Sequence, residues 1–147
     1  MMELLFRTQG DWPGFIIRIV LGGIMLPHGA QKLFGWFGGY GFNATMEFFT
    51  GIMKLPWAIA LCVVVIEFFG SICLLMGIGT KIWATGLLII MIGAICTTNF
   101  KNGFFMNWFG NQPGEGFEYH LLVIGMCLTL LLTGSGRYSL DSFILKG

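Results

Sequence analysis

Four apolar segments, separated by polar or glycine-rich stretches, dominate the pattern along the chain. They run from about residue 15 to 34, 57 to 76, 82 to 100 and 119 to 133. About 20 mostly apolar residues are enough for a helix to cross the hydrocarbon core of a membrane. The segments lack the two-residue alternation of barrel strands, and backbone groups in lipid must pair within their own segment. The pattern therefore predicts an all-α membrane protein, a four-transmembrane-helix antiparallel bundle.

The three connections between these segments differ in length and chemistry. Residues 77–81, GIGTK, are short and predict a tight antiparallel hairpin. Residues 34–56 open with the glycine-rich GWFGGYG, after which Asn43 is expected to cap a short interfacial helix and Pro56 to start the next segment. Residues 100–118 are rich in aromatic residues and glycine, and Trp108 suits the headgroup level. Both long connections fall at the same end, where we expect them to cover the bundle.

The composition supports a membrane location. The chain has 147 residues, 56% of them hydrophobic and 10% charged, whereas soluble domains carry roughly 25% charged residues. The lipid bilayer is therefore the expected partner, and a net charge of +1 gives no reason to expect nucleic acid. The length predicts a single domain over residues 1–147. The opening MMELLFRTQGDW lacks the basic region of a cleaved signal peptide, so we expect the first apolar segment to be retained.

The distribution of lysine and arginine predicts an orientation. The side that holds both termini and the short connection carries four basic residues: Arg7, Lys81, Arg137 and Lys146. The opposite side has Lys54 and Lys101, with Lys32 at the boundary. Basic residues gather on the cytoplasmic side of membrane proteins. We therefore expect both termini to be cytoplasmic.

Several charged residues lie inside the apolar segments. Placing one near the bilayer centre costs about 2.5–3.5 kcal/mol on insertion scales, so each needs a compensating partner. Arg18, His28 and Lys32 share one face of the first predicted helix, and Glu67 lies near the middle of the second. We expect Arg18 to pair with Glu67 across neighbouring helices. A protonated Glu67 that is hydrogen-bonded to a hydroxyl group or water is the competing interpretation.

The polar residues nearest the long connections form the candidate site. Glu67 and Arg18 are the candidate catalytic residues, and the candidate cofactor-binding residues are His28, Lys32, Glu118 and His120. Each has a structural alternative. Lys32 can extend to the headgroups, His28 can be a hydrogen-bonded structural residue, His120 can be interfacial, and the ion pair can serve only to set helix register.

The cysteines do not form a recognisable redox or metal motif. No pair has the Cys-x-x-Cys spacing, and all lie within apolar runs, at Cys62, Cys73, Cys96 and Cys127. We expect them to be small apolar packing residues, and we predict no metal site.

The sequence resembles the DoxX family of small four-helix membrane proteins from about Ile16 to Asp141. The most specific parts are Arg18 followed by LGGIMLPHGAQKLFG, then VVVIEFFGSICLLMGIGTKIWA, and the closing GFEYHLLVIGMCLTLLLTGSGRYSLD. The resemblance implies recurring polar positions at Arg18, His28, Lys32, Glu67, Glu118 and Asp141. The family takes its name from a subunit of an archaeal terminal quinol oxidase, and relatives are linked to thiosulfate:quinone oxidoreduction and membrane thiol-stress complexes. The resemblance thus implies a redox-associated role in a bacterial or archaeal inner membrane.

The favoured function is that of a quinone-linked oxidoreductase subunit. His28, Lys32 and Glu118 would hold the quinone, and Glu67 would carry protons. One alternative is a non-catalytic accessory subunit that docks a larger membrane complex or forms a homo-oligomer, which the absence of a cysteine pair favours. A small transporter is less favoured, because four helices without an inverted repeat leave little room for alternating access. A haem between His28 and His120 is also less favoured, because their expected depths differ by about one helical turn.

Overall fold

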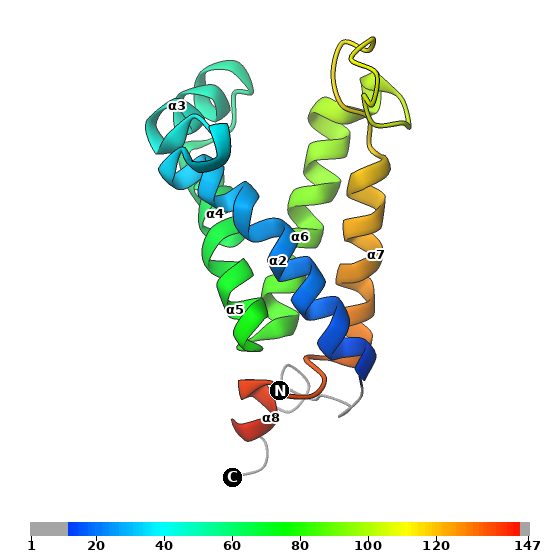
Figure 1. The fold of residues 1–147 in the computed structure, drawn as a ribbon. Helices are drawn as coiled ribbons and strands as arrows, with labels where there is room; N and C mark the ends of the chain where they lie inside the picture. Colours follow the sequence, from blue (N-terminus) through cyan, green and yellow to red (C-terminus); the bar gives the residue numbers. More distant parts are fainter. Residues whose placement is uncertain (1–11, 145–147) are drawn as a thin grey trace.

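The computed structural model describes residues 12–144, and this part of the chain is helical without a strand. Figure 1 shows the long helical segments side by side. The first is α2, and the second is continuous from α4 through η3 to α5. The bounds are Trp12–Phe34 for α2, Trp57–Val65 for α4, Ile66–Gly70 for η3, Ser71–Met76 for α5, Thr80–Ala94 for α6, Ile95–Asn99 for η4, Phe100–Asn102 for η5 and Glu118–Thr133 for α7. The prediction of an all-helical fold is confirmed.

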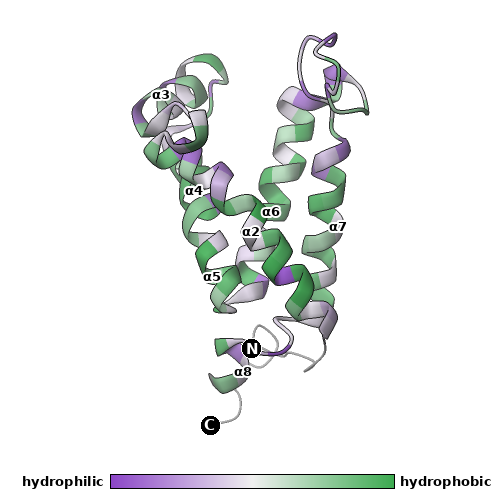
Figure 2. Cartoon of the chain, in the orientation of Figure 1, coloured by the Kyte–Doolittle hydropathy of each residue, from purple (hydrophilic) through white to green (hydrophobic). Residues whose placement is uncertain are grey.

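Three of the helical segments are long and apolar enough to cross a membrane. They are Trp12–Phe34, Trp57–Met76 and Thr80–Asn102, whereas the apolar helix Glu118–Thr133 has 16 residues. Figure 2 shows hydrophobic residues along the helices, with hydrophilic residues toward both ends of the molecule. The chain therefore has the surface of a membrane protein. A crossing by α7, and with it the four-helix membrane bundle, stays a prediction.

The first long connection contains more helix than the sequence predicts. It holds η1 (Trp36–Gly38), α3 (Gly41–Glu47) and η2 (Phe48–Ile52). The prediction that Asn43 caps this helix is wrong, because the helix begins at Gly41 and Tyr40 occupies the cap position. Gly38 and Gly41 both have positive φ, which lets the chain reverse and start its helix earlier. Pro56 does precede the next helix, as its cap residue.

Close contact between α2 and the second helical segment depends on two glycines. A Cβ atom added to Gly22 would lie 3.0 Å from the Ser71 carbonyl oxygen, and one added to Gly29 would lie 2.6 Å from the Phe68 backbone. Small residues allow such close approach between membrane helices. The buried apolar core includes Leu21, Met25, Leu74, Leu87, Met91, Val123 and Leu130.

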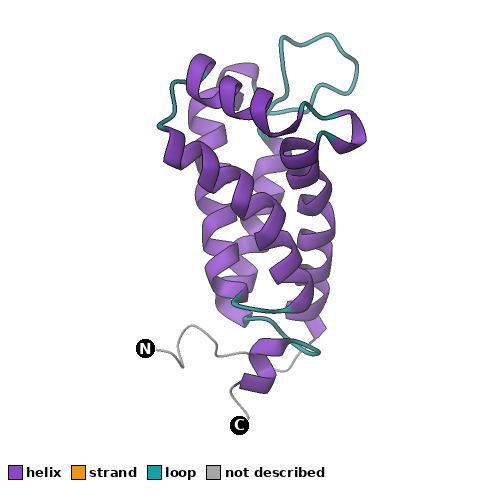
Figure 3. Cartoon of the chain, turned by 90° about the vertical axis from the view of Figure 1, so that its left-hand side faces the viewer, coloured by secondary structure: helices purple, strands orange, loops and turns teal. Residues whose placement is uncertain are grey.

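The short connection between α5 and α6 is a tight turn, as the sequence predicts. Gly77 ends α5 and Gly79 precedes α6, both with left-handed backbone angles that favour glycine. The chain after α7 returns beneath this turn and ends in the short helix α8, Leu140–Ile144. Figure 3 shows α8 at one end of the molecule and both long connections at the other. Of the basic residues used to predict orientation, Arg7 and Lys146 lie outside the described residues.

Candidate functional site

A cavity of about 630 Å³ lies between the helices, toward the end that carries the long connections. It is lined by α2, α4, α6 and α7 together with parts of both long connections, and most of its lining residues are apolar. Charged and aromatic polar residues form part of the wall: His28, Lys32, Glu67, Glu115, Tyr119 and His120. A mostly apolar cavity with a few convergent polar groups is typical of a small-molecule site.

Each π-helical segment of the described chain contributes to this wall. The segment η2 supplies Phe48 and Phe49, η3 supplies Glu67, and η4 supplies residues 97–99. A π-helical turn adds a residue to the turn and widens the helix, and such turns occur frequently at functional sites. Three separate helical segments thus depart from α-helical geometry at the same cavity.

Lys32 and Glu67 form an ion pair on the cavity wall, through Nζ and Oε2. The Glu67 side chain is 5% exposed and that of Lys32 is 27% exposed, so the carboxylate depends on this cation for compensation. The Ser71 hydroxyl donates to the Glu67 carbonyl oxygen one turn away. Close packing of Gly29 against the Phe68 backbone holds α2 where Lys32 reaches Glu67. The pair is therefore a consequence of the glycine contact between the two segments.

The predicted ion pair between Arg18 and Glu67 is wrong. Arg18 precedes Lys32 by 14 residues, about 21 Å along the α2 axis, and is not among the residues that line the cavity. The sequence placed both cations on one face of the helix but did not show which of them reaches the level of Glu67. The helix register set by Gly22 and Gly29 selects Lys32.

Arg18 is instead bound by backbone carbonyl groups at the opposite end of the helices. Its side chain is fully buried. Its nitrogen atoms donate to carbonyl oxygens where α5 ends and in the segment after α7, at distances from 2.5 to 3.2 Å: those of Leu74, Leu75, Ser135, Arg137 and Tyr138. Carbonyl groups at helix ends carry partial negative charge, which compensates the guanidinium group. Arg18 thus joins α2, α5 and the chain after α7.

Asp141 completes this end of the molecule. Its carboxylate accepts hydrogen bonds from the backbone N–H groups of Gly79 at 2.6 Å and Thr80 at 3.0 Å. Gly79 is the cap residue and Thr80 the first residue of α6, and N–H groups at a helix start have no partner within the helix. Asp141 therefore caps α6 from a distant part of the chain. The family resemblance implies a polar position at Asp141, but no local pattern indicates that its partner is the start of α6.

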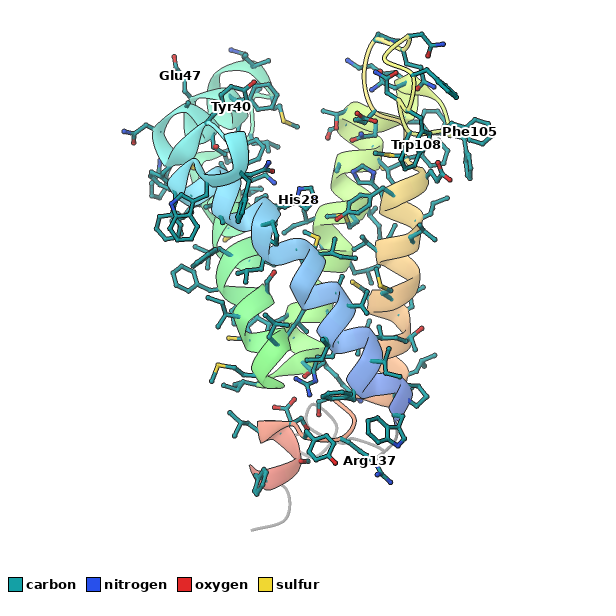
Figure 4. All side chains as sticks on the ribbon, viewed as in Figure 1. His28, Tyr40, Glu47, Phe105, Trp108 and Arg137 are labelled. Atoms are coloured by element: carbon teal, nitrogen blue, oxygen red, sulfur yellow. The ribbon has the colours of Figure 1, made fainter. Side chains whose placement is uncertain are left out.

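Two histidines and a tyrosine form the aromatic part of the cavity wall. The Tyr119 ring lies 5.8 Å from the His28 ring and 5.7 Å from the His120 ring, measured between centroids. The Tyr119 hydroxyl donates to the sulfur atom of Met25 at 3.3 Å. Figure 4 shows His28 on the side of α2 that faces α6 and α7. His120 Nδ1 is buried without a hydrogen-bond partner in the described structure, which is an unusual state for a polar atom and marks a point where a ligand can bind.

The remaining predicted residue, Glu118, serves the second long connection. Its carboxylate accepts a hydrogen bond from the Met106 backbone N–H at 3.3 Å, and it is not among the cavity-lining residues. The Asn99 side-chain amide also holds this connection by donating to the Glu115 carbonyl oxygen at 2.9 Å. Figure 4 shows Phe105 and Trp108 of this connection at the end of the molecule opposite Arg137.

The structure thus brings together four of the six predicted site residues and separates the other two. His28, Lys32, Glu67 and His120 line one cavity, whereas Arg18 and Glu118 do not. The candidate residues predicted from the sequence do not include Tyr119, although it lies between Glu118 and His120 in a segment that carries the family resemblance. Its position beside two candidate residues was the available signal.

The cysteines do not add a redox or metal centre within the described residues. All are free thiols, with Cys127 buried and Cys62 and Cys96 exposed. The described part of the chain also contains no group of three or more histidine, cysteine, aspartate or glutamate residues that could hold a metal ion.

The fold and the site define an α-helical membrane protein with a charged cavity between its helices. The chain belongs to the DoxX family, whose sequence profile matches residues 14–100. It is also similar to a protein of Bacillus subtilis (strain 168) named "Putative oxidoreductase CatD", with 33% identity over 132 residues, which cover 90% of this chain and 87% of that protein. No solved structure matches the chain.

Proposed function

We propose that this protein is a quinone-linked component of a redox system in the inner membrane, with the quinone headgroup in the cavity between the helices. The observation that carries the proposal is the composition of that cavity. It places an ion pair, two histidines and a tyrosine in a wall whose residues are mostly apolar. A quinone needs the same combination, because its ring is apolar and its two carbonyl groups accept hydrogen bonds.

The donors on the cavity wall fit a quinone headgroup. The Lys32 ammonium group and the histidine rings can donate to carbonyl oxygens, and a carboxylate such as Glu67 can accept from the hydroxyl groups of a quinol. The unpartnered Nδ1 atom of His120 provides a further polar group for a ligand to bind. Glu118, which was predicted to take part, is engaged with the second long connection instead.

A bound quinone would supply two-electron chemistry, because its reduction to a quinol takes up two electrons and two protons. The ion pair of Lys32 and Glu67 would hold and release protons at the cavity wall, and His28 would carry them between the pair and the open part of the cavity. The electrons would come from a partner protein that acts as the reductant. The oxidoreductase name of the Bacillus relative supports this assignment.

The membrane topology is part of the same proposal. All four long helical segments cross the inner membrane, and α3 with η2 lies at the interface. The end that carries Lys81 and Arg137 faces the cytoplasm, since basic residues favour that side. The chain would then act as a single domain, with its cavity near the opposite, non-cytoplasmic interface.

The test is to purify the protein in a mild detergent, extract it with organic solvent and quantify bound quinone, with an ultraviolet–visible spectrum to detect haem. We expect about one quinone per chain, reduced at least fivefold in His28→Ala and in His120→Ala. Thr129→Ala on α7 is the control, because its hydroxyl donates to the Gly125 carbonyl oxygen and the residue lies outside the cavity lining. Quinone-free protein after incubation with excess ubiquinone would refute the proposal and favour the non-catalytic accessory subunit.

A further inference from the structure

The lining of the cavity differs in chemistry from one helical element to the next. Its charged and aromatic polar residues come from α2, η3, α7 and the second long connection, and η4 adds Thr97, Thr98 and Asn99. The lining residues of α4 and α6 form an apolar side, with Ile59 and Val63 on α4 and Ile89, Ile90 and Ala94 on α6. A ligand that fills this cavity therefore meets hydrogen-bonding groups and, at α4 and α6, hydrocarbon side chains.

The apolar side includes exposed residues on both α4 and α6. The most extensive contacts of α6 are with α7, whereas α4 contacts α2, α3 and η2 and continues into η3. In Figure 1 the α3–α4 end and the α6–α7 end diverge toward the long connections. Ile59 of α4 is 52% exposed and Ile89 of α6 is 65% exposed, although both line the cavity. The cavity thus reaches the surface that lipid would cover.

Gly93 lies at this opening. It follows Ile89 by one helical turn, lines the cavity and is exposed, and a Cβ atom added to it would meet no other atom within 4 Å. Neither a close helix contact nor a positive φ angle requires glycine at this position. What its lack of a side chain provides is free space between α4 and α6.

We infer that the gap between α4 and α6, bordered by Ile59, Ile89 and Gly93, is a lateral portal through which the hydrocarbon tail of the ligand extends into the membrane. This inference rests on the proposed quinone function and specifies its substrate class, a quinone with a long isoprenoid tail taken up from the bilayer. The headgroup lies against Lys32, Glu67 and the histidines, and the tail leaves on the apolar side. Gly93 is then a residue that determines specificity for tailed over tail-less quinones.

The experiment measures binding of ubiquinone-10 and of its tail-less parent ubiquinone-0 to the full chain in lipid nanodiscs. Gly93→Leu places a side chain in the portal without a clash. Gly125→Leu is the matched control, because Gly125 of α7 is also exposed, and an added Cβ atom would meet nothing within 4 Å, but it does not line the cavity. We expect Gly93→Leu to weaken ubiquinone-10 binding at least tenfold and ubiquinone-0 binding less than twofold, with no change in Gly125→Leu.

The other possible results show whether the portal or the quinone function is wrong. If the wild-type chain binds ubiquinone-10 and Gly93→Leu binds it equally well, the portal is wrong and the quinone function stands. If Gly93→Leu weakens both ligands equally, the residue borders the headgroup and the tail route is wrong. If the wild-type chain binds neither quinone, the proposed function fails and this inference fails with it. Ile59→Trp tests the facing helix and should reproduce the selective loss of ubiquinone-10.

Discussion

Replacing Lys32 with methionine tests the ion pair at the cavity wall directly. The substitution keeps most of the side-chain volume and removes the cation that neutralises Glu67, a residue that is only 4% exposed. Breaking a buried ion pair by removing one partner costs about 3–5 kcal/mol. Because the Lys32 side chain is 27% exposed in the cavity, we place the loss in the free energy of unfolding at the lower limit, about 3 kcal/mol at pH 7.

The assay is reversible unfolding in mixed micelles by titration with sodium dodecyl sulfate, followed by circular dichroism. Adding Glu67→Gln to Lys32→Met should restore stability to within about 1 kcal/mol of wild type, since no buried charge remains. Lys101→Met is the matched control, because Lys101 is exposed and lies outside the cavity lining, and it should change stability by less than about 0.5 kcal/mol. A loss below about 1 kcal/mol in Lys32→Met, or a double variant as unstable as the single one, would refute the reasoning.

The remaining predictions concern the contacts that hold the helices together, each measured by the same unfolding assay. Arg18→Met leaves the carbonyl groups of Leu74, Ser135 and Arg137 without their donor and should lower the free energy of unfolding by at least about 3 kcal/mol. A loss under about 1 kcal/mol would contradict the role of Arg18. Asp141→Ala removes the cap of α6 and should cost about 1–2 kcal/mol, whereas an unchanged stability would show that the cap is dispensable. Gly29→Ala forces a Cβ atom to 2.6 Å from the Phe68 backbone and should cost about 1–3 kcal/mol, while Gly23→Ala, which meets nothing within 4 Å, is the neutral control.

Much of the fold could be predicted from hydropathy, because the bilayer imposes a length and an internal hydrogen-bonding pattern on any segment that crosses it. The second apolar segment was predicted at residues 57–76, and the structure has it at Trp57–Met76. The predicted start of α3 is wrong, because cap preference favours Asn43, whereas the turn at Gly38 and Gly41 starts the helix earlier. Cap preference is a local signal, and here the glycine backbone outweighed it.

Part of the candidate site could also be predicted from the sequence. His28, Lys32, Glu67 and His120 stood out because polar residues are costly in apolar segments, and all four line one cavity. Their partners could not be predicted, since a helical face specifies the direction around the helix axis but not the axial position relative to a neighbouring helix. Arg18 and Lys32 lie on the same face of α2, and only the packed structure shows that Lys32 meets Glu67.

The sequence by itself determined that the chain is helical and apolar, which residues carry charge inside it, and that it resembles the DoxX family. These properties depend on composition and local periodicity, which the chain carries at each position. Tertiary structure alone decided the ion pair, the carbonyl contacts of Arg18, the cap of α6 by Asp141 and the cavity with its open side. Each depends on the register between helices, and that register is set by backbone contacts at glycines such as Gly22 and Gly29, whose partners lie about 40 residues or more away in the chain.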